Sequence, residues 1–349
     1  MSEQIRVHKI ASATSRLQLE AELQIDPNIS PENGQVVVGE ALREKRIYAE
    51  LELVSGRMAK ILKGDRIVGV LGSRAALRGF VGTVPSQLFF GDTLHVLNKG
   101  GVIGRCTSSN QDLGDALPLR YLGTVVGPDG GARNIGENAI AESQSLESTV
   151  PIILVAGSCM NSGKTQAACE IVAGLTSFGV RVAAGKVSGV ACLRDVLNMQ
   201  DHGAIDALSF IDCGHPSTAG IESVVPLTKG ILNVLSASSP DVIVLEIGDG
   251  IVGGYGCESL FQDDELMRQC AFLVFCANDL LAAWGGVRFL EQIGRTIDCI
   301  SGPATDNEVG TQWVEQSLGL RAVNARTQPG DLARLSGKAF RSWSPVKRR

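Results

Sequence analysis

The stretch VAGSCMNSGKT, from Val155 to Thr165, ends in the Gly-Lys-Thr that closes many phosphate-binding loops. The common loop reads G-x-x-x-x-G-K-[ST], but the leading glycine here, Gly157, lies one position earlier. In such loops, backbone N–H groups and a helix N-terminus bind phosphate, the lysine reaches the β- and γ-phosphates, and the hydroxyl holds Mg²⁺. We predict a nucleotide-phosphate site whose members are Gly157, Asn161, Ser162, Gly163, Lys164, Thr165 and Gln166. The alternative is a turn of small residues with an accidental GKT.

A carboxylate at the end of an apolar segment, Glu246 in DVIVLEIGDG, is the second chemical signal. A phosphate-loop enzyme needs a second metal contact or a water-orienting base at such a position. An unpaired carboxylate there would be expensive to bury, which favours a functional role. We predict Thr165 and Glu246 as Mg²⁺ ligands. A further carboxylate, from the stretch between residues 195 and 206, is expected to join them, and we choose Asp201 over Asp195 and Asp206.

A lysine follows another apolar segment, in GKVSG, and this residue is Lys186. At the carboxyl end of a strand it would face the same crevice and bind an acidic substrate group or a transferring phosphate. A solvated surface lysine is the alternative. The small polar residues of FIDCGHPSTAG favour a binding loop, although helix capping would explain its hydroxyl groups equally well. The predicted substrate-side residues are Ser188, His215, Ser217 and Thr218.

The glycines that follow Glu246 also form a G-x-G-x-x-G pattern, made by Gly248, Gly250 and Gly253. After a strand, this pattern is typical of dinucleotide-binding turns. The next residues, GYGCESL, are a poor start for a helix, and the acidic residue at Asp279 lies further away than the usual separation of about 20 residues. We therefore regard dinucleotide binding as a remote alternative.

The order of the elements supports a phosphate-loop domain. Residues 151–340 alternate between apolar strands and helical stretches, which predicts an α/β fold with a doubly wound, mostly parallel sheet. Within an N-terminal domain of residues 1–126, short β-type segments separated by glycine turns predict a small β-rich domain, an antiparallel barrel or sandwich. Residues 127–150 have the composition of a linker, and residues 341–349 form a basic tail.

The β-rich region shows no catalytic cluster in its sequence. Arg74 and Arg78 lie among glycines and would suit an anionic ligand, but solvated loop arginines are the more common case. His95 stands alone on an alternating strand. We predict no active site in this region.

Composition narrows the class of protein further. The chain has 349 residues, 44% hydrophobic and 20% charged, and a net charge of -5. Nothing in this balance indicates a nucleic-acid partner. No apolar run reaches the roughly 18 residues of a membrane span, and the first residues lack the apolar core of a secretion signal. The nine cysteines never form C-x-x-C, so buried thiols are expected rather than disulfides or a metal site. We expect a cytoplasmic protein.

Three motifs in order resemble a known superfamily. The loop, with five residues between its glycines, is similar to that of dethiobiotin synthetase and the cobyrinic acid amide synthases. LEIGDG resembles a segment whose glutamate binds Mg²⁺, which implies that role for Glu246. GKVSG resembles a segment whose lysine contacts phosphate or substrate, which implies that role for Lys186. The resemblance covers about residues 151–325. The loop lacks the family's T-D-T, and it also lacks the leading lysine of MinD-type ATPases, which disfavours lysine exchange across a dimer. The chain also resembles uncharacterised phosphate-loop proteins with a similar G-K-x-x-G and G-x-x-S-T arrangement.

The resemblance implies an ATP- and Mg²⁺-dependent enzyme that activates a carboxylate or carbamate of a small molecule. Its catalytic residues would be Lys164, Lys186 and Glu246, and small-molecule kinase chemistry needs the same parts. Since no N-K-x-D motif appears, we favour ATP over GTP. The related enzymes often form homodimers. The alternative function is a nucleotide-switched regulator or assembly factor whose β-rich domain binds a protein partner.

Overall fold

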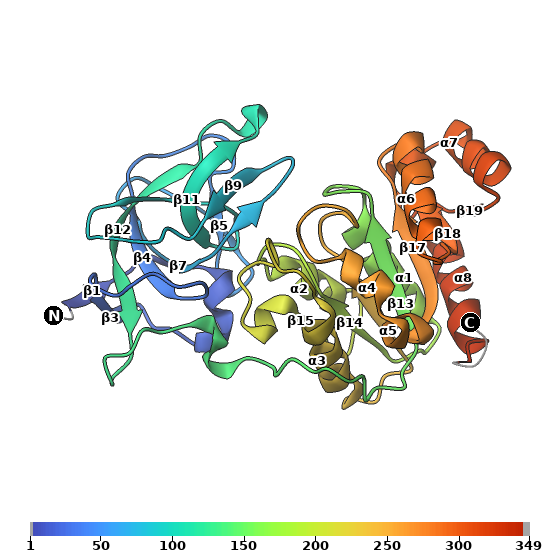
Figure 1. The fold of residues 1–349 in the computed structure, drawn as a ribbon, viewed down its shortest axis with the longest axis horizontal. Coiled ribbons are helices and arrows are strands. Elements are labelled where there is room, and N and C mark those ends of the chain that lie inside the picture. The colour runs from blue at the N-terminus through green and yellow to red at the C-terminus, as the bar shows by residue number, and fades with distance from the viewer. Residues whose placement is uncertain (1–2, 345–349) are drawn as a thin grey trace. The chain divides into compact units, whose positions relative to one another are not determined.

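The computed structural model describes residues 3–344, so the predicted basic end at 347–349 lies outside the described residues. The chain forms two compact units (Figure 1). Unit 1 contains the chain up to Ile140 together with Val190–Arg194 and Phe210–Ala219. Unit 2 contains Ala141–Gly189, Asp195–Ser209 and the chain from Gly220 onward. Within residues 3–344, no helix is long and apolar enough to cross a membrane.

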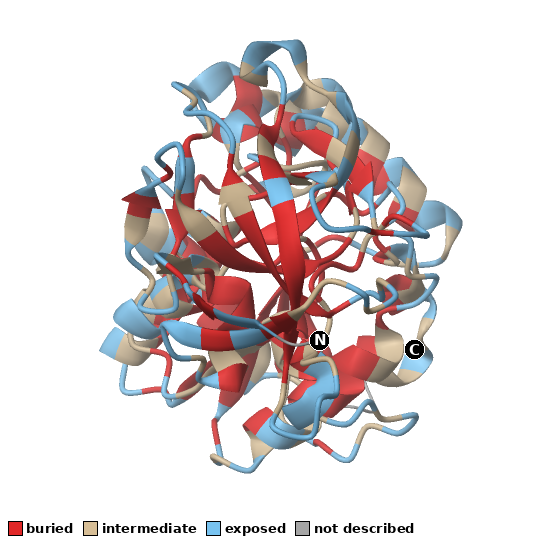
Figure 2. Ribbon diagram, turned by 90° about the vertical axis from the view of Figure 1, so that its left-hand side faces the viewer, coloured by how far each residue is buried: buried red, intermediate tan, exposed pale blue. Residues whose placement is uncertain are grey.

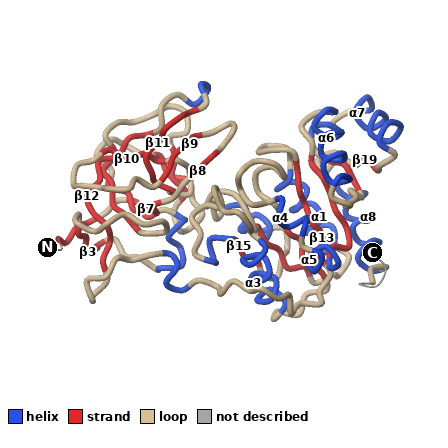
Figure 3. Tube along the Cα trace, in the orientation of Figure 1, coloured by secondary structure: helices blue, strands red, loops and turns tan. Residues whose placement is uncertain are grey.

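Unit 1 is built almost entirely of strands, with only short helical turns (Figure 3). Its strands are β1 (Glu3–Arg6), β2 (Lys9–Ile10), β3 (Glu22–Asp26), β4 (Val36–Ala41), β5 (Glu50–Glu52), β6 (Met58–Lys60), β7 (Arg66–Leu71), β8 (Arg74–Ala75), β9 (Phe80–Thr83), β10 (Thr93–Val96), β11 (Val102–Ser109) and β12 (Leu117–Val126). Four 3₁₀ turns accompany them: η1 (Ser12–Leu17), η2 (Gln111–Leu113), η3 (Ile135–Asn138) and η4 (Phe210–Cys213).

Five of these strands close into a barrel. The ring runs β12-β4-β7-β11-β10 and returns to β12, because β10 pairs with both β11 and β12. Most pairs are antiparallel, as predicted, but β7 and β11 pair in parallel. Leu94, Val96 and Tyr121 belong to the buried core cluster, and His95 between the first two is only half-buried. Figure 2 shows the buried residues concentrated along the strands of this unit.

The expected boundaries at residues 126 and 150 divide the chain into consecutive parts, whereas each compact unit consists of several separate segments of the chain. Residues 127–140 belong to unit 1, since Arg133 N–H donates to Val125 and η3 follows directly. Residues 141–150 belong to unit 2, where the side chain of Asn233 accepts the N–H groups of Glu147 and Ser148. Polar composition alone does not reveal such backbone attachments.

Unit 2 contains a seven-stranded sheet in which every pair is parallel, in the order β15-β14-β16-β13-β17-β18-β19. The strands are β13 (Ile152–Gly157), β14 (Val182–Lys186), β15 (Ala207–Ser209), β16 (Val242–Glu246), β17 (Cys270–Cys276), β18 (Cys299–Ser301) and β19 (Arg321–Ala322). The predicted α/β fold with a parallel sheet is confirmed. The short strand β15 was not expected, because its three residues carry no strand pattern of their own.

Helices cover both faces of this sheet. They are α1 (Lys164–Ser177), α2 (Arg194–Asp201), α3 (Val225–Ser236), α4 (Glu258–Gln262), α5 (Asp264–Gln269), α6 (Leu280–Gln292), α7 (Glu308–Trp313) and α8 (Pro329–Arg341), with 3₁₀ turn η5 (Pro303–Thr305) and π-helical turn η6 (Val314–Leu318). On β13, Ile153 and Val155 pack into the cluster that contains residues of α1 and α8, while Ile152 and Leu154 face residues of α3, α4 and α5. A strand buried on both faces explains why PIILVAG reads as a continuous apolar run.

The central strand β13 lies between β16 and β17. From β13 the chain passes through α1 to β14 on one side, and β17 lies on the other side. The connection from β13 runs to one side of the sheet, to β14, and the connection from β16 runs to the other side, to β17. The carboxyl ends of the neighbouring strands β13 and β16 therefore form a topological switch point. Ligands of open α/β sheets bind beyond the carboxyl ends of the strands at such a point.

Candidate functional site

The leading glycine of the loop is required by close packing. Gly157 ends β13, and a Cβ added there would lie 2.5 Å from Ser162 Oγ, 2.7 Å from the carbonyl oxygen of Cys276 and 3.0 Å from Lys164 Cδ. The lysine stem and the loop hydroxyl thus pass directly over this residue. The one-residue displacement from the common spacing keeps a glycine where the loop folds back on the strand.

The loop turns through two residues with left-handed backbone. Asn161 has φ 62° and Gly163 has φ 90°. Asparagine and glycine are the residues that adopt this conformation at least cost. Helix α1 then begins at Lys164, and Gly163 supplies no side-chain cap. The first N–H groups of α1 are left for another acceptor, as in an anion-binding helix terminus.

Lys164 is folded onto the loop itself. Its side chain is buried, and Nζ donates to the carbonyl oxygen of Cys159 at 2.7 Å and to Ser162 Oγ at 3.3 Å. Burial lowers the pKa of Lys164, and the charge of Glu246 opposes that effect. A buried ammonium held only by neutral oxygens gains from a nearby anion. The ammonium group of Lys164 is therefore suited to binding an anion such as a phosphate.

Glu246 is the centre of the site. It is only 1% exposed, and its Oε1 accepts hydrogen bonds from Thr165 Oγ1 at 2.9 Å and from Lys186 Nζ at 3.3 Å. Its other oxygen, Oε2, is buried without a hydrogen-bond partner. Such an unsatisfied acceptor costs about 1–3 kcal/mol, more when charged. The structure thus brings together three of the predicted residues from the loop, β16 and β14.

The carboxylate that completes this network is Asp195, not the chosen Asp201. Lys186 Nζ forms an ion pair with Asp195 Oδ2 as well as with Glu246. Asp195 lies in the first turn of α2, whereas Asp201 is the exposed last residue of that helix. The sequence offered both carboxylates, but only the position at which α2 begins decides which one faces Lys186.

The glycine-rich segment after Glu246 packs against the loops rather than opening a dinucleotide turn. A Cβ on Gly248 would lie 2.0 Å from the carbonyl oxygen of Ser188, and one on Gly250 would lie 2.4 Å from that of Ser158. Asp249 between them has φ 59°, and its charge acts on Lys164. No helix starts until α4, which has five residues. These glycines permit close approach of neighbouring backbone segments of this chain, whereas the glycines of a dinucleotide fingerprint admit a pyrophosphate and a closely packed helix.

The remaining predicted residues have more varied surroundings. Ser188 is buried and donates to the carbonyl oxygen of Gly248 at 3.1 Å, so it anchors the glycine-rich segment. The exposed side chain of Gln166 donates to Glu170 on α1, which leaves only its backbone for a phosphate. His215, Ser217 and Thr218 belong to unit 1, and the last two are buried there.

The side chain of Asn278, which follows β17, lies at the phosphate loop. Its Nδ2 donates to Cys159 Sγ at 2.8 Å and its backbone N–H donates to Ser158 Oγ at 3.3 Å. Asp279 caps α6 by accepting the N–H of Ala282. Asn278 is thus a further member of the phosphate-loop region, although it lies outside the loop motif in the sequence.

The residues present fit a magnesium ion bound together with phosphates. Thr165 and Glu246 supply a hydroxyl and a buried carboxylate, and Glu246 Oε2 has no partner. Mg²⁺ prefers oxygen ligands and is usually held by one or two carboxylates plus substrate phosphates. Among residues 3–344, no group of three or more histidine, cysteine or acidic side chains forms a ready-made metal cage.

No family model matches the sequence, and no curated protein is significantly similar to it. Chloroplast FtsY from Physcomitrella patens is similar in structure, with 12% identity and a TM-score of 0.35 over 54% of this chain and 62% of that one. The signal recognition particle 54 kDa protein from Aeropyrum pernix, solved with GDP, has 14% identity and a TM-score of 0.36 over 56% and 47%. A ParA family ATPase from Chlorobium tepidum has 14% identity and a TM-score of 0.32 over 56% and 97%.

This chain thus spans less than two thirds of the length of the first two structures. With TM-scores below 0.5, these similarities carry no argument about function. The fold assignment rests on the parallel strand order and on the loop between β13 and α1. None of the three is a dethiobiotin synthetase, and that resemblance stays a prediction.

Proposed function

We propose that unit 2 binds ATP with Mg²⁺ and transfers the terminal phosphoryl group to a carboxylate or carbamate of a small molecule. The main support is the half-satisfied, buried carboxylate of Glu246, which is hydrogen-bonded to Thr165 of the GKT sequence. Bound Mg²⁺ would neutralise charge on the phosphates. The chain's own residues hold the phosphates in place and stabilise the charge that develops on them.

Each residue then has a distinct role. Lys164 and the first N–H groups of α1 hold the β- and γ-phosphates and stabilise charge on the transferred group. Lys186, held between Asp195 and Glu246, provides a second positive charge for the acceptor or the transferred phosphoryl group. An acceptor carboxylate oxygen attacks the γ-phosphorus and ADP leaves. An amine then attacks the acyl phosphate, and inorganic phosphate is released.

Calorimetric titration of ATP and GTP, each with Mg²⁺, tests the binding step. Lys164→Ala should weaken nucleotide binding about ten- to 100-fold, since it removes charged hydrogen bonds to phosphate. Lys63→Ala replaces an exposed lysine in unit 1 and should leave the affinity unchanged. If neither nucleotide binds the wild type, the proposal is overturned.

Trapping with hydroxylamine tests the reaction itself. An acyl phosphate formed from ATP and a small carboxylate reacts with hydroxylamine to give a hydroxamate, which is detected by its iron complex. We expect hydroxamate and ADP in equal amounts when the acceptor is present. Phosphate release without hydroxamate, unaffected by any small carboxylate, would instead favour plain hydrolysis.

One observation favours the second candidate function, a nucleotide-switched regulator. The segment Val190–Arg194 belongs to unit 1, while the residues on either side of it, including Lys186 and Asp195, belong to unit 2. A change in the Lys186–Asp195 ion pair on nucleotide binding would act directly on the ends of this segment. A regulator would hydrolyse ATP slowly and bind a protein partner in only one nucleotide state, which pull-down with ATP and with ADP would detect.

A further inference from the structure

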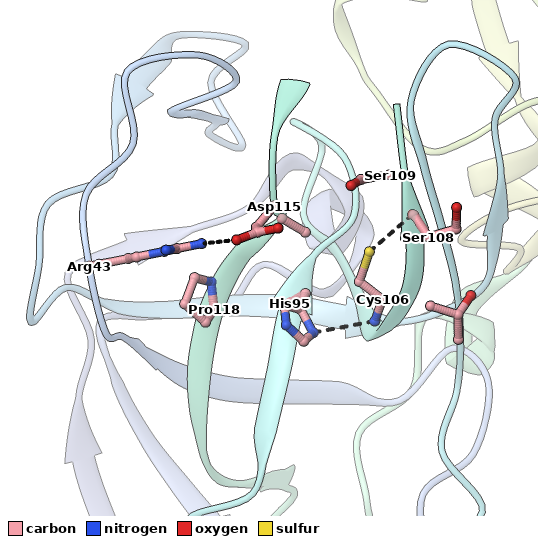
Figure 4. Close-up of a pocket in the computed structure, with 9 residues that line it drawn as sticks. Arg43, His95, Cys106, Ser108, Ser109, Asp115 and Pro118 are labelled. Carbon is pink, nitrogen blue, oxygen red and sulfur yellow. Dashed lines mark hydrogen bonds and ion pairs between the residues drawn. The ribbon is translucent and has the colours of Figure 1, made fainter. Parts of the chain in front are cut away.

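A pocket of about 270 Å³ opens in unit 1, and no phosphate-loop residue lines it (Figure 4). It lies over the outer side of β10, β11 and the start of β12. Its walls are mainly polar, lined by Arg43, His95, Cys106, Thr107, Ser108, Ser109, Asp115, Ala116 and Pro118. No motif in the sequence groups these residues, which come from four different segments.

A β-bulge shapes one wall. In the pairing of β11 with β9, Cys106 lies opposite Gly82 and Ser108 lies opposite Val81, so Thr107 is an extra residue. The bulge interrupts the alternation of β11 and presents three consecutive hydroxyl residues, Thr107 to Ser109, at the pocket. Bulges commonly re-aim side chains next to functional sites.

His95 forms the base of the pocket as a hydrogen-bond donor. On β10, its neighbours Leu94 and Val96 are buried in the barrel, so His95 faces outward. Its Nδ1 accepts the backbone N–H of Cys106 at 3.3 Å, and the proton of the neutral ring therefore resides on Nε2. Burial, and then the charge of Arg43, lowers the pKa of His95, which keeps the ring neutral. Figure 4 shows the ring between Pro118 and Cys106.

The charges around the pocket are predominantly positive. Arg43 lines it, and the charges of Lys45 and Arg105 act on Cys106 and His95 respectively. The opposing carboxylate, Asp115, pairs with Arg43 at 3.4 Å with both side chains at least half exposed. Exposed ion pairs of this kind contribute little to stability, so Arg43 can exchange Asp115 for another anion at small cost in free energy.

We propose that this pocket binds a small oxyanion, a carboxylate or phosphate group, through Arg43, His95 Nε2–H and the hydroxyl groups of the β11 bulge. Arg43 and Asp115 line the pocket, and the further positive charges of Lys45 and Arg105 act on Cys106 and His95, so the surrounding charge favours an anion. Its volume is just below the range of about 300–1,000 Å³ typical of ligand pockets, which favours a ligand of a few heavy atoms over a nucleotide. The site is separate from the nucleotide site and does not depend on the proposed function.

The test uses the full-length protein without nucleotide. Its four histidines are labelled with ¹⁵N, and the His95 imidazole signal is assigned by its loss in His95→Gln. Acetate, succinate and inorganic phosphate are titrated separately, with sodium chloride at matched ionic strength as the reference. We expect saturable shifts of the His95 signal, and the anion that saturates at the lowest concentration identifies the group recognised.

Arg43→Gln should weaken this binding at least about ten-fold, since it removes a charged hydrogen bond. Arg57→Gln, which replaces an exposed arginine of the same unit, should bind as the wild type does. Because Arg43 is about half exposed, its loss should not unfold the barrel, and circular dichroism checks this. Shifts no larger than those caused by chloride, or equal affinity in Arg43→Gln and wild type, would overturn the proposal.

Discussion

Replacing Gly157 by alanine tests whether the phosphate loop needs a glycine at this position, one residue earlier than in the common loop. The new methyl group would lie 2.5 Å from Ser162 Oγ and 2.7 Å from the carbonyl oxygen of Cys276, about 1 Å closer than favourable contact. That carbonyl is fixed, because it accepts the N–H of Ser158 at 2.9 Å. Overpacking of this kind costs about 1–3 kcal/mol. The same methyl group pushes the stem of Lys164, so ATP affinity should fall about ten-fold or more.

Urea unfolding followed by circular dichroism measures the loss of stability, and calorimetry measures the loss of ATP affinity. The matched control is Gly285→Ala in α6, where an added Cβ meets nothing within 4 Å. Alanine in a helix interior is favoured over glycine by about 0.5–1 kcal/mol, so this variant should be as stable as wild type or more so. If Gly157→Ala keeps both the stability and the ATP affinity of wild type, the packing argument for this glycine is refuted.

Three further predictions follow from particular side chains. Glu52→Ala should lower the free energy of unfolding by at least about 2 kcal/mol, because it leaves several buried donors unsatisfied. Glu50 is about half exposed, so Glu50→Ala should lower it by at most about 1 kcal/mol. Urea unfolding of the two variants compares these losses. Asp195→Asn should slow ATP turnover and Asp201→Asn should not, as measured by phosphate release. His95 has a folded pKa below its ordinary 6.5, so it contributes stability above pH 6.5 that is lost as the pH falls through the folded pKa. Wild type should therefore lose more stability than His95→Gln between pH 7.5 and pH 5, and equal losses would contradict this reasoning.

The parts of the site that the sequence predicted are those fixed by strand ends. Lys186 and Glu246 each end a strand of one parallel sheet, and Thr165 follows the strand between β16 and β17, so the fold alone brings them to one edge. Asp195 depends instead on where α2 begins after an irregular segment. His95 and its pocket depend on a bulge in another strand, which period-two alternation cannot reveal.

Glu52 shows the strongest limit of local sequence patterns. It ends the short strand β5, is fully buried, and accepts hydrogen bonds from the backbone N–H groups of Leu193 at 2.7 Å and Arg194 at 2.8 Å, about 140 residues away. Ser12 also donates to it. A buried carboxylate is retained only where donors surround it, so Glu52 fixes the segment Val190–Arg194 within unit 1. The next residue in the chain is Asp195, the partner of Lys186. Glu52, in the separate two-stranded sheet of β5 and β6, thereby helps to position the start of α2, and no pattern around the phosphate loop could identify it.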